Sequence, residues 1–257
     1  SITELPEEYS ERVENLVEQY NTKIISKHAG RKLKIENGQV FISQYETDSL
    51  EVLNKLIDFS RGHNKNHSQS VERWLEQNEH YIDDPFKKEK LKSLFSDSAV
   101  ALIYGSAGTG KTYFINHIAQ FFNSADKLFL SVTHTAVENL RRRISSSNSE
   151  FSTIQKIKYK KEIKCDILFL DESSMVSNSD MAELLKRISC KFLVLVGDIF
   201  QIDAIQFGNW FELAKRNIKI EAIVELDTPY RTQDNDLIEI WNKVRNIEPD
   251  IMECLSR

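Results

Sequence analysis

An α/β fold, with a parallel sheet covered by helices on both faces, is the architecture that this sequence predicts. Short apolar runs such as Ala99–Tyr104, Ile167–Leu170 and Phe192–Val196 alternate with amphipathic helical stretches in the later part of the chain. Strands that are apolar at nearly every residue are typical of parallel sheets buried on both faces. The residues before Ala99 lack this alternation, and they predict helices with one hairpin.

Composition sets the broad class of the molecule. The chain has 257 residues, of which 40% are hydrophobic and 28% charged, and no apolar run is long enough to span a membrane. Its length suggests one full domain with a smaller one, and its net charge of −5 argues against a generally basic coat for nucleic acid. The three cysteines are far apart and lack metal-ligand spacing, which predicts unpaired thiols in a reducing compartment, the cytoplasm.

Residues 1–98 are expected to form a small, mostly helical N-terminal domain. Residues 32–42 alternate around Asn37-Gly38, a dipeptide that favours the tight turn of a β-hairpin. A capping-box pattern at Asp48–Glu51 predicts the start of a helix that ends near Gly62. The other helices expected in this domain cover residues 6–24, 71–80 and 86–95.

No chemical pattern stands out in this N-terminal part. His63, His67 and His80 lack the spacing of metal ligands, so they are expected to be solvated. The surface of this part is a candidate for contact with a protein partner.

Residues 99–226 are expected to form the α/β domain. The expected strands cover residues 99–104, 127–132, 166–170, 192–196 and 220–226. The expected helices cover residues 111–122, 136–144, 180–189 and 208–216. In open α/β sheets the functional side chains lie at the carboxyl ends of the strands, and the motifs described next follow strands.

The first motif matches the phosphate-binding pattern G-x-x-x-x-G-K-[ST] at every fixed position, between an apolar strand and a helix. Its residues are Gly105, Ser106, Ala107, Gly108, Thr109, Gly110, Lys111 and Thr112. The three glycines are expected to adopt positive φ, which brings backbone N–H groups and a helix N-terminus against phosphate oxygens. Lys111 is expected to reach the β- and γ-phosphates, and the Thr112 hydroxyl to bind Mg²⁺. The alternative is a glycine-rich turn with a chance lysine.

Two later strand ends also carry polar side chains. Asp171 and Glu172 follow an apolar strand, so one carboxylate can serve Mg²⁺ while the second orients and deprotonates a water. The alternative for this pair is a helix N-cap. Gln201 follows the next strand, which should lie beside that of Asp171, and is expected to contact a γ-phosphate.

Six segments, in order and spacing, resemble the early motifs of superfamily 1 helicases, most closely those of the RecD-like branch. They are GSAGTGKT, SVTHTAVENLRRR, FSTIQ, ILFLDESSMV, VLVGDIFQI and LDTPYRT. The resemblance implies that residues 99–226 are a RecA-like P-loop ATPase domain. Residues 227–257, with a helix expected over 236–244, would then open a second RecA-like domain that is truncated.

The resemblance implies roles for individual residues. Those implied to bind or hydrolyse Mg-ATP are Lys111, Thr112, Asp171, Glu172 and Gln201. Arg231 is implied to act as an arginine finger, with a surface ion pair as its alternative, and Tyr230 to stack on adenine. The family usually has an adenine-reading glutamine before the phosphate loop, whereas Lys90–Ser98 contains none.

The same resemblance implies single-stranded nucleic acid over the carboxyl edge of the sheet, with DNA favoured over RNA. The residues implied to contact the strand are Thr133, His134, Thr135 and Thr153, and the alternative for His134 is a simple loop residue. Hydroxyls and helix N-terminal amides suit a sugar-phosphate backbone without base specificity. The interval Arg141–Lys164 holds eight basic residues against two acidic ones. This positive charge favours contact with a nucleic-acid strand, and the alternative from charge alone is a solvated face without a partner.

The sequence therefore predicts a fragment of an ATP-dependent helicase or translocase that couples Mg-ATP hydrolysis to movement on single-stranded DNA or RNA. One RecA-like domain alone is expected to be weakly active or inactive. A nucleotide-dependent switch without translocation and a P-loop kinase are the alternatives. Truncation is also expected to expose Trp210 and Trp241.

Overall fold

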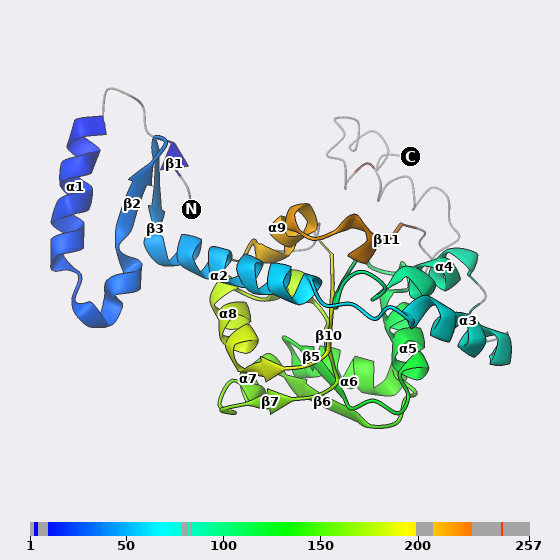
Figure 1. Ribbon diagram of the computed structural model, residues 1–257. Coiled ribbons are helices and arrows are strands. Elements are labelled where there is room, and N and C mark those ends of the chain that lie inside the picture. The colour runs from blue at the N-terminus through cyan, green and yellow to red at the C-terminus, as the bar shows by residue number, and fades with distance from the viewer. Residues whose placement is uncertain are drawn as a thin grey trace, which may run out of the picture.

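A six-stranded parallel sheet forms the centre of the computed structural model, which describes residues 3–4, 10–78, 82, 84–198, 208–227 and 243 (Figure 1). The strand order is β11-β4-β10-β8-β5-β6, and every neighbouring pair is parallel. The strands are β4 (Val100–Gly105), β5 (Lys127–Ser131), β6 (Ser149–Thr153), β8 (Ile167–Leu170), β10 (Phe192–Gly197) and β11 (Ile223–Leu226). The predicted α/β class is confirmed.

Helices cover both faces of this sheet, as predicted. Successive strand residues point to opposite faces, so the apolar core divides into two layers. The helices on one face are α2 (Ser43–Ser60), α7 (Ile154–Ile157), α8 (Asn178–Arg187) and α9 (Trp210–Asn217). Those on the other are α3 (His67–Gln77), α4 (Pro85–Ser93), α5 (Lys111–Phe121) and α6 (His134–Arg143). None of the helices in the described part of the chain has the length and apolar character of a membrane span.

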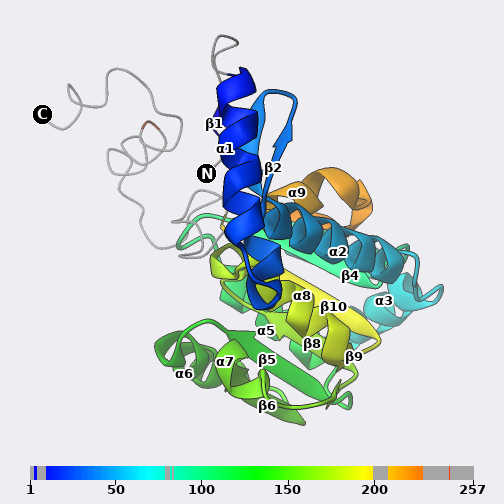
Figure 2. The same ribbon diagram turned by 90° about the vertical axis from the view of Figure 1, so that its left-hand side faces the viewer.

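The helix α2 packs directly on the sheet domain, against α8 and α9 (Figure 2). Its residues Val52 and Leu56 are fully buried in the same apolar layer as β4. The predicted start at a capping box is wrong, because α2 begins at Ser43, directly after β3, and Asp48 lies inside the helix. There the buried Asp48 carboxylate accepts a hydrogen bond from Gln44 at 2.6 Å. The division of the chain at residue 98 remains a prediction.

The predicted hairpin is confirmed. β2 (Leu33–Glu36) and β3 (Gln39–Ile42) pair antiparallel around Asn37 (φ 51°) and Gly38 (φ 72°), the left-handed conformation that this turn needs. The short β1 (Thr3–Glu4) joins β3, and α1 (Ser10–Lys23) packs against β2. This hairpin module projects from the sheet domain (Figure 1), and no side chain from 12 to 47 is fully buried.

The remaining elements are short. They are the 3₁₀ turns η2 (Ser26–Arg31), η3 (Ser173–Met175) and η4 (Ile220–Ala222), and the paired strands β7 (Ile163–Lys164) and β9 (Ile188–Ser189). Neither β6 nor the β7–β9 pair was predicted from the sequence. The predicted helix over 236–244 lies outside the described residues, apart from residue 243.

Two side chains that were expected in solvent are buried. His67 has no exposed surface, and its Nε2 donates a hydrogen bond to the Leu91 carbonyl at 2.9 Å. Trp210 is also fully buried, and its indole N–H donates to the Val176 carbonyl at 2.8 Å. Each ring makes one hydrogen bond to a backbone carbonyl inside the core, which lowers the cost of burying its polar group, although Nδ1 of His67 has no hydrogen-bond partner among the described residues. His63 is exposed, as expected, whereas His80 and Trp241 lie outside the described residues.

Candidate nucleotide site

The phosphate loop joins β4 to α5, and at each of its glycine positions a larger residue would be sterically unfavourable. Gly108 (φ 88°) and Gly110 (φ 83°) adopt the predicted positive φ, and Gly110 is the N-cap of α5. The same prediction is wrong for Gly105, where the loop needs space instead. A Cβ there would lie 2.5 Å from the Thr109 hydroxyl and 2.7 Å from the Leu226 carbonyl oxygen. The loop therefore closes tightly against the end of β11.

Side chains of the loop hold it in shape. The Lys111 ammonium donates to the carbonyl oxygens of Gly105 at 2.6 Å and Ser106 at 2.8 Å. The buried Thr109 hydroxyl donates to the same Ser106 carbonyl at 2.9 Å. Lys111 thus lies across the loop with its charge at the N-terminus of α5, where an anion is favoured.

The order of the strands brings three strand ends to this loop. β10 lies between β4 and β8, with Val196 beside Ile103 and Leu195 beside Leu170. The prediction that the strand before Gln201 neighbours that of Asp171 is confirmed. Gln201 itself lies outside the described residues, as do Tyr230 and Arg231.

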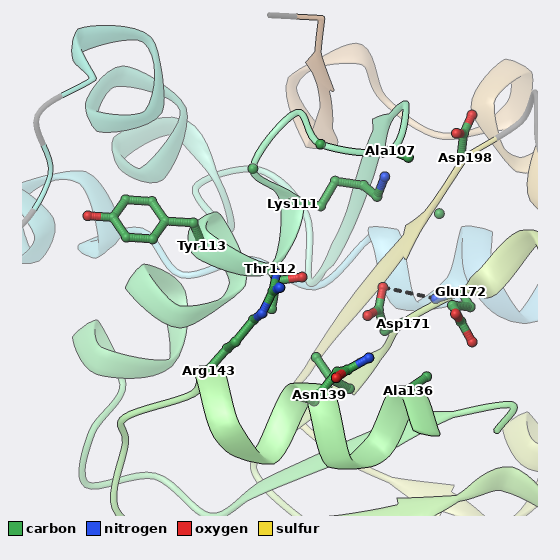
Figure 3. A pocket seen from close by; sticks show the side chains of 14 residues that line it. Ala107, Lys111, Thr112, Tyr113, Ala136, Asn139, Arg143, Asp171, Glu172 and Asp198 are labelled. Carbon is green, nitrogen blue, oxygen red and sulfur yellow. Dashed lines mark hydrogen bonds between the residues drawn. The ribbon is translucent and has the colours of Figure 1, made fainter. Parts of the chain in front are cut away.

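These strand ends, the loop, α5 and α6 surround a cavity of about 460 Å³ (Figure 3). Its acidic side chains are Asp171, Glu172 and Asp198, and its basic ones are Lys111 and Arg143. The volume is in the range of small-molecule sites. Asp198, which is 5% exposed, was missed in the sequence analysis. Its signal was available, because it is the first charged residue after a buried strand, as Asp171 is.

Asp171 directly follows β8 and is tied to the sheet and to its neighbour. Its N–H donates to the Leu130 carbonyl at 2.9 Å, and its carboxylate accepts the Glu172 N–H at 3.0 Å. Burial, assisted by the charge of Glu172, raises the pKa of Asp171 to about 6, although that N–H and Lys111 oppose the shift. Burial therefore disfavours the charged form of this carboxylate, and a bound cation would favour that form.

The residues around Asp171 fit a magnesium ion. The Asp171 carboxylate and the Thr112 hydroxyl line the same cavity, and oxygen ligands are those that Mg²⁺ prefers. In the described ranges no group of three or more His, Cys, Asp or Glu side chains is placed to hold a metal unaided. Such a sparse set suits Mg²⁺, which keeps several waters and shares its ligands with phosphates.

Glu172 has an unusual backbone. Its φ of 56° is in the left-handed region, which a residue with a long side chain rarely adopts. Its carboxylate accepts a hydrogen bond at 2.9 Å from the hydroxyl of Ser131, the buried last residue of β5. Two neighbouring strands therefore fix the Glu172 side chain at the cavity. Residue 131 was expected as part of the strand over 127–132, and spacing in the sequence does not show its contact with Glu172.

The residues implied to contact nucleic acid lie at the ends of two adjacent strands, β5 and β6. Thr133 caps α6 by accepting the Ala136 N–H at 3.1 Å, and Thr133, His134 and Thr135 are all exposed. Thr153 is 4% exposed, and its hydroxyl caps α7. The structure places the first three on an open surface and Thr153 largely inside. Their contact with a strand remains a prediction.

Ion pairs neutralise part of the positive charge of the basic interval. Half of its eight basic side chains form ion pairs. These pairs are Arg141 with Glu138, Lys158 with Asp180, Lys160 with Glu150 and Lys164 with Glu162. Arg143 instead lines the nucleotide cavity.

A phosphate loop between a buried strand and a helix, faced by carboxylates from the sheet, defines a P-loop nucleoside-triphosphatase domain. The comparison with protein families agrees with this class, because the family described as "AAA domain" matches residues 87–256. The chain belongs to the AAA domain family.

Several known proteins are similar to parts of this chain in sequence or in structure. Replication protein 1a of Olive latent virus 2 (isolate Italy) is 26% identical over 133 residues, which are 50% of this chain and 14% of that protein. A structure of two coordinating Pif1 helicases at forked DNA superposes with a TM-score of 0.48 and 18% identity, over 68% of this chain and 51% of that one. Bacteroides Pif1 bound to single-stranded DNA superposes with a TM-score of 0.42 and 18% identity, over 61% and 45%. The chain thus spans about half of these helicases or less.

Proposed function

We propose that this chain is the nucleotide-hydrolysing part of a superfamily 1 helicase or translocase of the RecD-like branch. The observation that carries the proposal is the convergence of the phosphate loop with the ends of β8 and β10 on one cavity. The six motifs that resemble superfamily 1 helicases support the helicase assignment. The nucleotide is ATP with Mg²⁺, and the compartment is the cytoplasm.

Four side chains at the cavity have positions that support a role in binding or hydrolysis. Lys111 and the loop amides hold the β- and γ-phosphates, while Thr112 and Asp171 would hold Mg²⁺. Bound Mg²⁺ would neutralise charge on the phosphates. Glu172, fixed by Ser131, orients a water and takes its proton. Gln201, Arg231 and Tyr230 keep their implied contacts to γ-phosphate and adenine as part of the proposal.

The carboxyl edge of the sheet is the proposed path for single-stranded nucleic acid, with DNA favoured over RNA. The exposed Thr133–Thr135 segment at the N-terminus of α6 supports this path, because hydroxyls and free helix amides bind phosphate. The hairpin module is the proposed surface for a protein partner, because it projects from the sheet domain.

The nucleotide part of this proposal is tested by titrating the 257-residue chain with Mg-ATP. We expect Lys111→Ala to weaken binding by at least tenfold, since it removes the only lysine at the phosphates among the described residues. Glu172→Gln should keep this affinity and, in an ATPase assay of the longer parent protein, abolish hydrolysis. Lys65→Ala, on an exposed loop, is the control and should bind normally. Normal turnover by Glu172→Gln would disprove the assignment of the base.

Binding of a labelled single-stranded oligonucleotide distinguishes the helicase hypothesis from the hypothesis of a nucleotide-dependent switch. We expect fluorescence anisotropy to show that the chain binds the oligonucleotide, with an affinity that Mg-ATP changes. Loss of binding in a Thr133→Ala, Thr135→Ala double variant would support the strand path. A chain that binds nucleotide but no strand would favour the switch.

A further inference from the structure

Three consecutive arginines at the end of α6 have three different environments. Arg141 pairs with Glu138 at 3.4 Å, and its guanidinium lies 5.1 Å from the centre of the Phe151 ring. Arg142 is exposed and does not line the cavity. Arg143 lines the nucleotide cavity and forms no ion pair with a described carboxylate. One of these cations is therefore available to a ligand of that cavity.

The helix α6 turns one whole face to the cavity. Ala136, Asn139, Leu140 and Arg143 all line it, and their spacing of three and four residues places them on the same side of an α-helix. Arg143 is the charged member of this face. Figure 3 shows its side chain pointing from α6 toward Thr112, the second residue of α5.

The direction of a bound nucleotide follows from the carboxylates. In Figure 3 Asp171 and Glu172 lie on one side of Thr112, and Tyr113 lies on the other. If Glu172 is the base, the terminal phosphate lies toward these carboxylates. The chain of phosphates then crosses the N-terminus of α5, and the nucleoside leaves on the side of Tyr113. Arg143, whose side chain points toward Thr112 in Figure 3, then faces the phosphate nearest the nucleoside.

Charge supports a ligand phosphate at this position. A nucleoside triphosphate brings about four negative charges, and Lys111 and Arg143 are the two cationic side chains of the described lining that can offset them. Lys111 is already close to the loop carbonyls on the other side. A guanidinium matches a phosphate with paired N–H donors, which makes its hydrogen bonds stronger than neutral ones.

We infer that Arg143 is a nucleotide-binding residue that holds the α-phosphate from the α6 side of the cavity. This inference rests on the proposed function, since it uses Glu172 to orient the phosphates. It gives the chain a second cation at the nucleotide that the phosphate-binding pattern does not contain. It also removes Arg143 from the basic interval that was assigned to nucleic acid.

The test compares Arg143→Ala with Arg142→Ala in the 257-residue chain, by calorimetric titration with Mg-ATP and with Mg-ADP. Because both nucleotides carry an α-phosphate, we expect Arg143→Ala to weaken both by about tenfold, the effect of one charge-assisted contact. Arg142→Ala, one residue away, should match the unmodified chain. Arg143→Lys should recover part of the loss, because a lysine keeps the charge without the paired donors.

Two results would overturn the inference. Equal affinities of Arg143→Ala and Arg142→Ala would remove Arg143 from the nucleotide. A loss for Mg-ATP with normal Mg-ADP binding would place Arg143 at the γ-phosphate. Thermal unfolding should be unchanged in both variants, since both side chains are exposed. Failure of the proposed function has a different signature, namely normal nucleotide binding by Lys111→Ala.

Discussion

Glu172 and Ser131 show how this fold places one carboxylate. The positive φ of Glu172 re-aims the chain directly after β8, and the Ser131 hydroxyl on β5 fixes the side chain that results. A strained backbone that is kept in place by its neighbours is frequent at functional sites. The phosphate loop and the pair Asp171-Glu172 could be predicted as candidate site residues, because each follows an apolar strand in the sequence. The Ser131 and Arg143 positions could not, because they depend on which elements become neighbours in space.

The Ser131 contact predicts a positioning effect. We expect Ser131→Ala to lower the ATPase kcat by about tenfold to a hundredfold with little change in KM, since it frees the Glu172 carboxylate without touching the phosphates. Steady-state ATPase assays check this, with strand present if needed for turnover. Ser152→Ala, at a buried serine on β6, is the control and should keep its rate. A rise in KM with unchanged kcat would mean that Ser131 acts on binding instead.

At the scale of elements, His67 joins three helices. Its imidazole bonds the Leu91 carbonyl of α4 from the start of α3. Its ring also packs edge to face on Phe121 at the end of α5, with 5.3 Å between the ring centres. Burial lowers the pKa of His67, despite the hydrogen bond to Leu91. Its solvated state was predicted from spacing alone, but its partners come from much later residues, which local patterns do not show.

This burial makes stability depend on pH. The unfolded chain protonates His67 near pH 6.5 and the folded chain only at lower pH, so stability should fall as the pH decreases below about 6.5. One such group contributes at most about 1.4 kcal/mol per pH unit. Urea unfolding at pH 7.5 and pH 5.5 checks this: His67→Gln should lose part of the pH dependence, whereas His63→Gln, at an exposed histidine, should keep it. Identical pH dependence in both variants would contradict the expectation.

The elements themselves could be predicted where the apolar pattern is strong. β4, β8 and β10 are apolar throughout and lie in the middle of the sheet, so their positions match the prediction within about two residues. β6 was missed because it is an edge strand that contains serines and a glutamate. The start of α2 was predicted wrongly because its N-cap residue, Ile42, has no side chain that can cap a helix, so the sequence carries no signal there.

At the scale of the whole molecule, the N-terminal residues contribute unequally. The hairpin module has no fully buried side chain from 12 to 47, whereas α2 buries Val52 and Leu56 against the sheet. Stability follows the apolar area that is removed from water. The nucleotide-binding domain should therefore depend on α2 and not on the module before it.

Deleting residues 1–42 tests this difference. The shortened chain should lose about 1 kcal/mol or less of its unfolding free energy in urea, since residues 12–42 have no fully buried side chain. Leu56→Ala in the full chain should lose about 2–5 kcal/mol, the usual effect of truncating a buried leucine. The control is Leu50→Ala on the same helix, where the side chain is 54% exposed. A large loss on deletion would show that the module supports the core.

The strand order has a consequence for how the chain is made. β4, which leads into the phosphate loop, pairs within the described part of the chain with β10 and β11 alone, and both are synthesised long after it. A ribosome must therefore release Phe192 before this strand can find its first partner, and Ile223 before it finds its second. Until then the apolar strand β4 has no strand to pair with. Intermediates that expose such a strand fold slowly and are prone to aggregate. The first strand of this sheet to be synthesised thus stays incompletely paired until the last two strands have left the ribosome.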